Sequence, residues 1–303
     1  DWKNSYIKGF YSIQSGDIQG GLLNITNDSL FGNAEINSLG TGAHTFSNNV
    51  CNVSNAFGGG TDFALLELKN ITTGGANLAI SGNTFENFVN FGVFSGRSNN
   101  VTIDNNVFSP DPTAVNFRSI RVDTKQRTLA PQGVFVSGAV ITNNTFNGNV
   151  ALGQNGIHVE LANSDNISSI GTVILGTGGN ENDFNTDIKK MISLNNETTS
   201  TSGDPIWVGT YISTKGKVTT NVDGTNNNYD VGSGLQLPSA MTLANLFLLE
   251  DKVQHKIDDS GIGFVLVKAN NDYVTVNSYV APTITTPSVQ RGIDAASPGF
   301  TVN

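Results

Sequence analysis

One short phrase recurs along the chain and constrains its fold more than any other feature. An apolar residue is followed by two small or polar residues, an asparagine, one further residue and a phenylalanine. In three clear copies the asparagine and phenylalanine are Asn83 and Phe85, Asn106 and Phe108, and Asn144 and Phe146. Self-similarity at a period of roughly 20 to 50 residues is typical of a solenoid. The phrase therefore predicts an all-β fold of stacked coils, a right-handed parallel β-helix.

The repeated residues themselves are predicted to be structural. Equivalent positions of successive coils lie about 4.8 Å apart. An interior asparagine at a tight bend can then hydrogen-bond its neighbours above and below, and the phenylalanine two residues later can stack into a column. We expect a structural ladder made of Asn83, Asn106, Asn144, Phe85, Phe108 and Phe146.

Composition excludes several classes of protein. The net charge of −9 argues against a nucleic-acid partner, because phosphate binding needs a basic surface. No apolar run approaches the roughly 20 residues that span a bilayer, so we expect no membrane insertion. The single cysteine, Cys51, excludes an internal disulfide framework and is interpreted as a small buried hydrophobe. The high content of Asn, Thr and Gly indicates an exported bacterial protein.

The chain changes character at Pro238. Residues 239–261 have apolar side chains at helical spacing, with Ser239 as N-cap and Gly261 as the stop. Two strand-like segments follow and predict a hairpin. We therefore expect a β-helix over residues 1–237, a helix-plus-hairpin cap or linker over 238–281, and a linker with the opening segment of a following β-helix over 282–303.

The terminal phrase SVQRGIDAASPGFTVN resembles the short amphipathic segment that opens many bacterial β-helix domains of the pectate-lyase-like class. Together with the loose repeat from Tyr6 to Phe184, it makes the chain resemble the right-handed parallel β-helix repeat domains of large secreted bacterial surface proteins. The resemblance implies a secreted or cell-surface location and adjoining domains of a longer parent chain. It does not specify an enzyme.

One constellation of side chains has the composition of a catalytic site. A second strand follows each phrase, and aligning Gly92, Ser119 and Gly156 predicts which side chains point outward. Arg121 would lie beside His158, and Asp123 beside Glu160. A β-helix lyase needs carboxylates for Ca²⁺ and a basic group, and a glycosidase needs two carboxylates. The candidate catalytic residues are therefore Asp123, Glu160, Arg121 and His158.

A simpler interpretation of these four residues is stronger. Charged residues on an outer face are normally solvated, and their ion pairs contribute under about 1 kcal/mol. The motif triplets of pectate lyases and polygalacturonases are absent, although an isolated NTD occurs at residues 185–187. This absence weakens the enzymatic hypothesis.

Other candidates concern ligands. Trp207 and Tyr211 alternate on one expected strand and would form a stacking platform for a sugar, although core packing explains Trp207 as well. Arg97 is a further candidate ligand-binding residue. The three histidines are too far apart in sequence for a zinc signature, so no metal site or cofactor is predicted. Four aspartates near Gly- and Asn-rich loops would bind Ca²⁺ weakly at best: Asp104, Asp165, Asp183 and Asp187.

Two functional hypotheses result. The favoured one is a non-catalytic β-helix module of a large secreted or cell-surface bacterial protein, adhesive or stalk-like, with glycans or cell-surface polysaccharide as partners. The alternative is a polysaccharide lyase or glycoside hydrolase that acts in an outer groove around residues 121–160.

Overall fold

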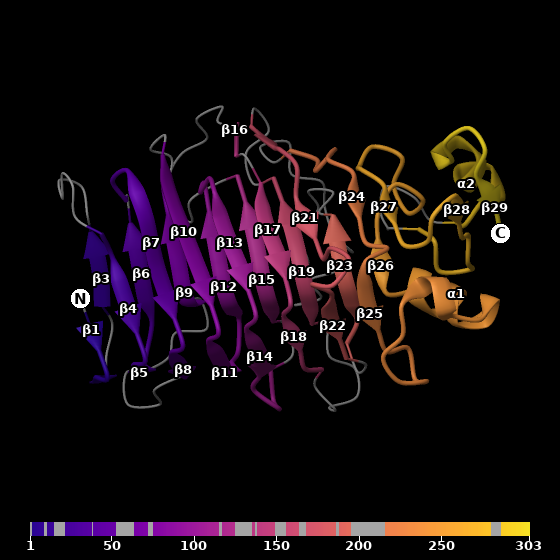
Figure 1. Cartoon of the computed structure of the whole chain (residues 1–303). Coiled ribbons are helices and arrows are strands. Elements are labelled where there is room, and N and C mark those ends of the chain that lie inside the picture. Colours follow the sequence, from indigo (N-terminus) through magenta and orange to yellow (C-terminus); the bar gives the residue numbers. More distant parts are fainter. Residues whose placement is uncertain are drawn as a thin grey trace.

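A computed structural model describes residues 2–8, 11–14, 22–37, 39–52, 64–71, 75–114, 117–124, 135–136, 138–148, 156–163, 168–185, 188–194, 216–279 and 286–303. Its strands stack from the N-terminus to the C-terminus into an elongated solenoid (Figure 1). Every strand pairing within the three long sheets is parallel, and neighbouring strands belong to successive coils. The predicted all-β parallel solenoid is confirmed.

Successive coils each contribute one strand to each of three sheets, except that the last coil contributes β25 and β26 to the second and third sheets alone. The first sheet contains β1 (Trp2–Lys3), β4 (Asn24–Thr26), β7 (Gly42–Ser47), β10 (Ala76–Ser81), β13 (Val101–Asp104), β17 (Ala139–Thr142) and β21 (Ile174–Leu175). The second contains β2 (Tyr6–Lys8), β5 (Ser29–Phe31), β8 (Val50–Asn52), β11 (Thr84–Phe88), β14 (Val107–Pro110), β18 (Thr145–Phe146), β22 (Asn182–Phe184) and β25 (Asn227–Tyr229). The third contains β3 (Tyr11–Gln14), β6 (Ala34–Asn37), β9 (Ala64–Lys69), β12 (Phe91–Gly96), β15 (Arg118–Asp123), β19 (Ile157–Ala162), β23 (Lys190–Leu194) and β26 (Val253–Gln254).

Short elements complete the described structure. Three two-stranded pairs are β16 (Phe135–Val136) with β20 (Ser169–Ile170), β24 (Val222–Asp223) with β27 (Val265–Leu266), and β28 (Asn271–Asp272) with β29 (Thr301–Val302). The helices are a 3₁₀ turn, η2 (Pro238–Ala240), and two α-helices, α1 (Leu243–Glu250) and α2 (Val289–Ala295).

The bend between the first and second sheets explains why asparagines are so common in the repeat. The residue before four of the ladder positions adopts a left-handed backbone, with φ between 54° and 66° at Asn48, Gly82, Asn105 and Asn143. Glycine and asparagine tolerate this conformation better than other residues do. At these bends two adjacent residues have different roles. The first adopts the left-handed backbone, and the second is an asparagine whose side chain is buried in the interior.

The second of these residues forms a buried side-chain ladder through the solenoid. In each step the backbone N–H and the side-chain Nδ2 of one asparagine both donate to Oδ1 of the next, at 2.8–3.3 Å. Each Nδ2 also donates to a main-chain carbonyl of another coil. The members are Asn49, Asn83, Asn106, Asn144, Asn182 and Asn227.

An aromatic column lies two residues beyond the ladder. Phe85, Phe108, Phe146, Phe184 and Tyr229 stack face to face, with centroids 4.8–5.2 Å apart and interplanar angles of 9–21°. Toward the N-terminus the β8 strand continues the same row with the buried Cys51, which lies opposite Phe85. Burial raises the pKa of the Cys51 thiol, so it is an inert packing residue.

The C-terminal region differs from its predicted organisation. Helix α1 ends at Glu250, well before the predicted stop at Gly261, and Thr242 rather than Ser239 accepts the capping hydrogen bond from Asn245 N. Val253, expected on the helix, begins β26, the last strand of the third sheet. The boundary at residues 237 and 238 therefore falls inside a coil, because α1 is an insertion between β25 and β26.

The predicted hairpin over residues 263–280 is wrong. Its first segment contains β27, which pairs in parallel with β24, and its second contains β28, which pairs in parallel with β29. Each segment therefore pairs with a strand distant in sequence and not with the other segment. The prediction that residues 282–303 open a following β-helix is not tested by these contacts and stays a prediction.

Candidate functional site

Two of the four predicted catalytic residues, Arg121 and Glu160, belong to a row of side chains on the outer face of the third sheet. One outward position is in register from β6 to β26, and we name its side chains the outer row. Most of them are buried, and Arg121 retains 14% exposure of its side chain. The outer row consists of Glu35, Glu67, Phe94, Arg121, Glu160, Ser193 and Gln254.

Arg121 is the centre of a buried ion-pair network in this row. Its guanidinium donates to Glu160 Oε2 at 2.9 Å and to Asp123 Oδ2 at 2.7 Å. Arg118 Nε donates to the same Glu160 oxygen at 3.2 Å. Burial lowers the pKa of Arg121, but the charges of Glu160 and Asp123 more than offset this, so the pKa is raised. The four groups are two cations and two anions held by one another.

This geometry corrects the predicted pairing. Arg121 is in register with Glu160 rather than with His158, and Asp123 is in register with Ala162 rather than with Glu160. Aligning Ser119 with Gly156 is two residues out of register, because Ile120 pairs with Val159 and not with Ile157. Arg118, which no sequence pattern identified, lies one outward position before Arg121 on the same strand.

His158 lies in the interior and not on the outer face as predicted. Its ring is 5.3 Å from that of Phe146, and its Nδ1 is 3.2 Å from Ser119 Oγ. The core residue Val159 follows it directly, so two successive side chains face inward and strict alternation fails here. Burial lowers the pKa of His158 to about 3, with a smaller contribution from the charge of Lys252. It is therefore neutral and cannot act as an outer catalytic group.

Of the predicted ligand-binding residues, the structure describes Arg97. Arg97 follows β12 in a left-handed backbone conformation, and its amide donates to the carbonyl oxygen of Asp123 at 2.8 Å. Trp207 and Tyr211 lie outside the described residues.

Two of the four aspartates expected to bind Ca²⁺ weakly, Asp104 and Asp183, lie within the described residues. Asp104 accepts hydrogen bonds from Thr142 and Asn143, and Asp183 accepts one from Asn228. Asp165 and Asp187 lie outside the described ranges. In the described part of the chain, no group of three His, Cys, Asp or Glu side chains could hold a metal ion.

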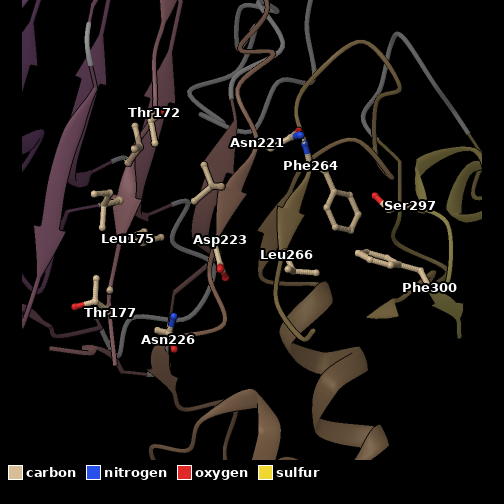
Figure 2. Close-up of a pocket in the computed structure, with 14 residues that line it drawn as sticks. Thr172, Leu175, Thr177, Asn221, Asp223, Asn226, Phe264, Leu266, Ser297 and Phe300 are labelled. Carbon is tan, nitrogen blue, oxygen red and sulfur yellow. Dashed lines mark hydrogen bonds between the residues drawn. The ribbon is translucent and has the colours of Figure 1, made fainter. Parts of the chain in front are cut away.

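A groove of about 520 Å³ lies where the first sheet gives way to the pair β24 and β27 (Figure 2). Ile174 and Thr177 approach it from the β21 side, Asp223 lies on β24, and the rings of Phe264 and Phe300 form the opposite wall. Four segments distant in sequence contribute to it, so no local motif could have identified it.

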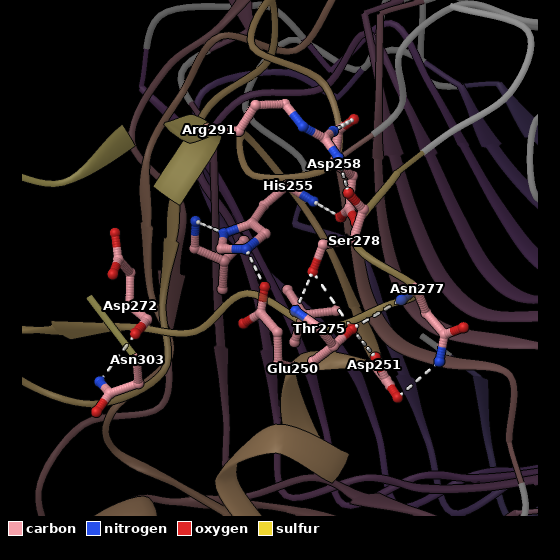
Figure 3. A network of polar contacts seen from close by, with 12 residues as sticks. Glu250, Asp251, His255, Asp258, Asp272, Thr275, Asn277, Ser278, Arg291 and Asn303 are labelled. Carbon is pink, nitrogen blue, oxygen red and sulfur yellow. Dashed lines mark hydrogen bonds and ion pairs between the residues drawn. The ribbon is translucent and has the colours of Figure 1, made fainter. Parts of the chain in front are cut away.

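A second polar network holds the C-terminal segment (Figure 3). Arg291 of α2 donates to the carbonyl oxygens of Asp258, Ser278 and Thr286. Beneath it, His255 Nε2 is 2.8 Å from Glu250 Oε1, a buried pair. Figure 3 shows His255 turned toward Glu250 and Arg291 turned toward Asp258, and we interpret these contacts as a structural clamp on the C-terminal segment.

Asp258 of this clamp and the neighbouring Asp272 have raised pKa values. Burial raises the pKa of Asp258 to about 6, although the charges of Lys190 and His255 act against it. Burial, together with the charge of Glu250, also raises the pKa of Asp272 to about 6. The pKa of His255 is raised, because Glu250 more than offsets the effect of burial.

Comparisons with known proteins found no relative from which a function could be inferred. No protein-family model, curated protein or solved structure matches the chain. Within the described ranges, no helix combines the length and hydrophobicity that crossing a membrane requires.

Proposed function

We propose that this chain is a non-catalytic β-helix module of a larger secreted or cell-surface bacterial protein, adhesive or stalk-like, that contacts glycans. The observation that carries the proposal is the state of the outer row. Asp123 and Glu160 are 2% and 0% exposed, and Arg121 engages both carboxylates. A general acid and base must reach the substrate to exchange a proton with it.

The distribution of polar groups supports a mechanical role. The hydrogen-bonded ladder and the stacked aromatic column run through successive coils of the solenoid. Because each coil contacts only its neighbours, such a body is quasi-one-dimensional and long relative to its width. It is suited to hold a binding surface at a distance from the point of attachment.

Incubation of the chain with a panel of plant, algal and bacterial polysaccharides, with and without Ca²⁺, tests this proposal. We expect binding to at least one polysaccharide, with no release of reducing ends and no unsaturated products. Turnover that disappears in Asp123→Asn or Glu160→Gln, but persists in the exposed control Asp294→Asn, would establish the enzymatic alternative instead. Circular dichroism of each variant separates loss of chemistry from loss of fold.

One atom favours that alternative. Glu160 Oε1 is buried and has no hydrogen-bond partner among the described residues. A carboxylate oxygen without a partner beside two guanidinium groups is a feature that lyase or hydrolase sites also use. The product assay decides between the two, since a closed structural network yields no product whatever the substrate.

A further inference from the structure

The groove shown in Figure 2 has the size and the lining of a ligand site. Its volume of about 520 Å³ lies within the range of roughly 300–1,000 Å³ that small-molecule sites occupy. Such sites are mainly apolar and carry a few fixed polar groups that orient the ligand. Both components are present here, and they come from different walls.

The apolar wall is aromatic and reaches solvent. The rings of Phe264 and Phe300 lie 6.2 Å apart at 59°, and both side chains are half-buried. His255 backs Phe264 with its ring at 4.9 Å, and the backbone N–H of Phe264 donates to Asn221 Oδ1 at 2.8 Å. Across the groove, Ile174 is 41% exposed. These surfaces fit the C–H face of a sugar ring, which is apolar and flat.

The polar component is a carboxylate in a fixed orientation. Asp223 Oδ1 accepts hydrogen bonds from the backbone N–H and the hydroxyl of Thr225, at 2.9 and 2.7 Å. Asn226 and Thr177 lie at the same end of the groove. Sugar hydroxyl groups donate to carboxylate, amide and hydroxyl oxygens, and a bond to an ionised acceptor is about twice as strong as a neutral one. The site therefore presents acceptors at one end and rings at the other.

Charge selects the class of sugar. Among the described residues that line the groove, Asp223 is the one with a charged side chain, and the whole chain carries a net charge of −9. A uronate or a sulfated sugar would be repelled, because like charges disfavour association. We infer that the groove binds a neutral oligosaccharide, with one ring face against Phe300 and Phe264 and its hydroxyl groups toward Asp223. This inference rests on the proposed function and adds to it the place and the class of ligand.

Calorimetric titration of the full chain tests the inference with four hexasaccharides. The neutral probes are cellohexaose, maltohexaose and the hexamer of N-acetylglucosamine, and the anionic probe is hexagalacturonate. We expect at least one neutral hexamer to bind at least tenfold more tightly than hexagalacturonate. Phe300→Ala should weaken this binding at least tenfold. Asp223→Asn, which retains the acceptor for Thr225, should weaken it about threefold and reduce the discrimination against hexagalacturonate.

The matched control is Leu243→Ala, which removes an exposed apolar side chain of α1 away from the groove and should change nothing. Binding that survives both Phe300→Ala and Asp223→Asn would overturn the groove as the site, while leaving the proposed glycan-binding module intact. Failure of all three neutral hexamers to bind, or equal affinity for hexagalacturonate, would overturn the inference itself. Cleavage of any probe would instead refute the proposed function.

Discussion

Two buried polar rows run along this solenoid, one inside it and one on the outer face of its third sheet. The inner row places the same residue, asparagine, in successive coils, and each member makes the same two bonds to the next. The outer row changes from Glu67 to Phe94 to Arg121 to Glu160 in consecutive coils. Its charged members are satisfied only locally, by whichever partner the adjacent strand provides.

The difference shows that the function inferred from a cluster of charged residues depends on whether the cluster is exposed or buried. Exposed, the outer row would resemble the substrate cleft of a β-helix enzyme. Buried and ion-paired, its charged members hold one another in place, which is the arrangement that the proposed non-catalytic role requires. Uncharged asparagines avoid this dependence, because each amide carries both the donor and the acceptor that its neighbours require.

The largest effect should follow from Glu160→Gln. The substitution leaves Arg118 and Arg121 in a buried site with one carboxylate fewer, and removing one partner of a buried pair is strongly destabilising. We expect a loss of about 3 kcal/mol in the free energy of unfolding by urea denaturation, against less than about 0.5 kcal/mol for the exposed control Asp294→Asn. Similar small losses in both would show that the outer row is solvated.

Asn144→Ala should rank second and tests the inner row. It leaves the backbone N–H of Asn106 and the carbonyl oxygen of Ile103 without their partners in the interior. We expect a loss of about 2 kcal/mol, since each buried group left unsatisfied costs roughly 1–3 kcal/mol. The control is Asn147→Ala, which replaces a half-buried asparagine outside the ladder. If the two variants unfold at the same urea concentration, the ladder contributes nothing of its own.

The pH dependence of stability should report on His158. Its folded pKa of about 3 lies below the unfolded value of 6.5, so the unfolded chain takes up a proton first as the pH falls. The stability that its neutral form contributes is complete above pH 6.5 and is lost below it. Between pH 7 and pH 5 the wild type should lose about 2 kcal/mol more than His158→Gln. If the free energies of unfolding of the wild type and of His158→Gln fall equally between pH 7 and pH 5, the histidine is exposed to solvent in the folded chain.

The smallest effect, and a stabilising one, is expected at the end of the inner row. Asp28 precedes Asn49 in the ladder, and its Oδ2 is buried without a hydrogen-bond partner among the described residues. Asp28→Asn supplies an N–H₂ group where the other coils have one. We expect a gain of about 1 kcal/mol in thermal or urea unfolding. A loss of stability would show that the carboxylate is itself required at this position.

The inner row could be predicted from sequence, because repetition makes equivalent residues visible. Asn83, Asn106 and Asn144 recur with Phe85, Phe108 and Phe146 in one phrase. The outer row could not, since its residue type changes from Glu67 to Phe94 to Arg121 in consecutive coils and its alignment depends on the register of the strands. The side chains of His158 and Val159 both point inward, so strict alternation along this strand assigns His158 to the wrong face.

The C-terminal coil and the groove could not be predicted from the sequence for a different reason. Helix α1 interrupts a coil, and its helical pattern in the sequence predicts a domain boundary at Pro238, although β26 after the helix still belongs to the third sheet. The groove joins Ile174, Asp223, Phe264 and Phe300 from segments that only the folded chain brings together. Local patterns report local structure, whereas both features depend on contacts between distant coils.

Labelling of carboxyl groups in the folded chain, read residue by residue by mass spectrometry, tests the central claim most directly. A water-soluble carbodiimide with an amine nucleophile modifies a carboxylate only where both reagents reach it. Asp123 and Glu160 are buried in ion pairs, whereas Asp223 is exposed in the groove. We predict rapid modification of Asp223 and protection of Asp123 and Glu160 until the chain unfolds. Modification of all three at similar rates would contradict the account and make the outer row an accessible site.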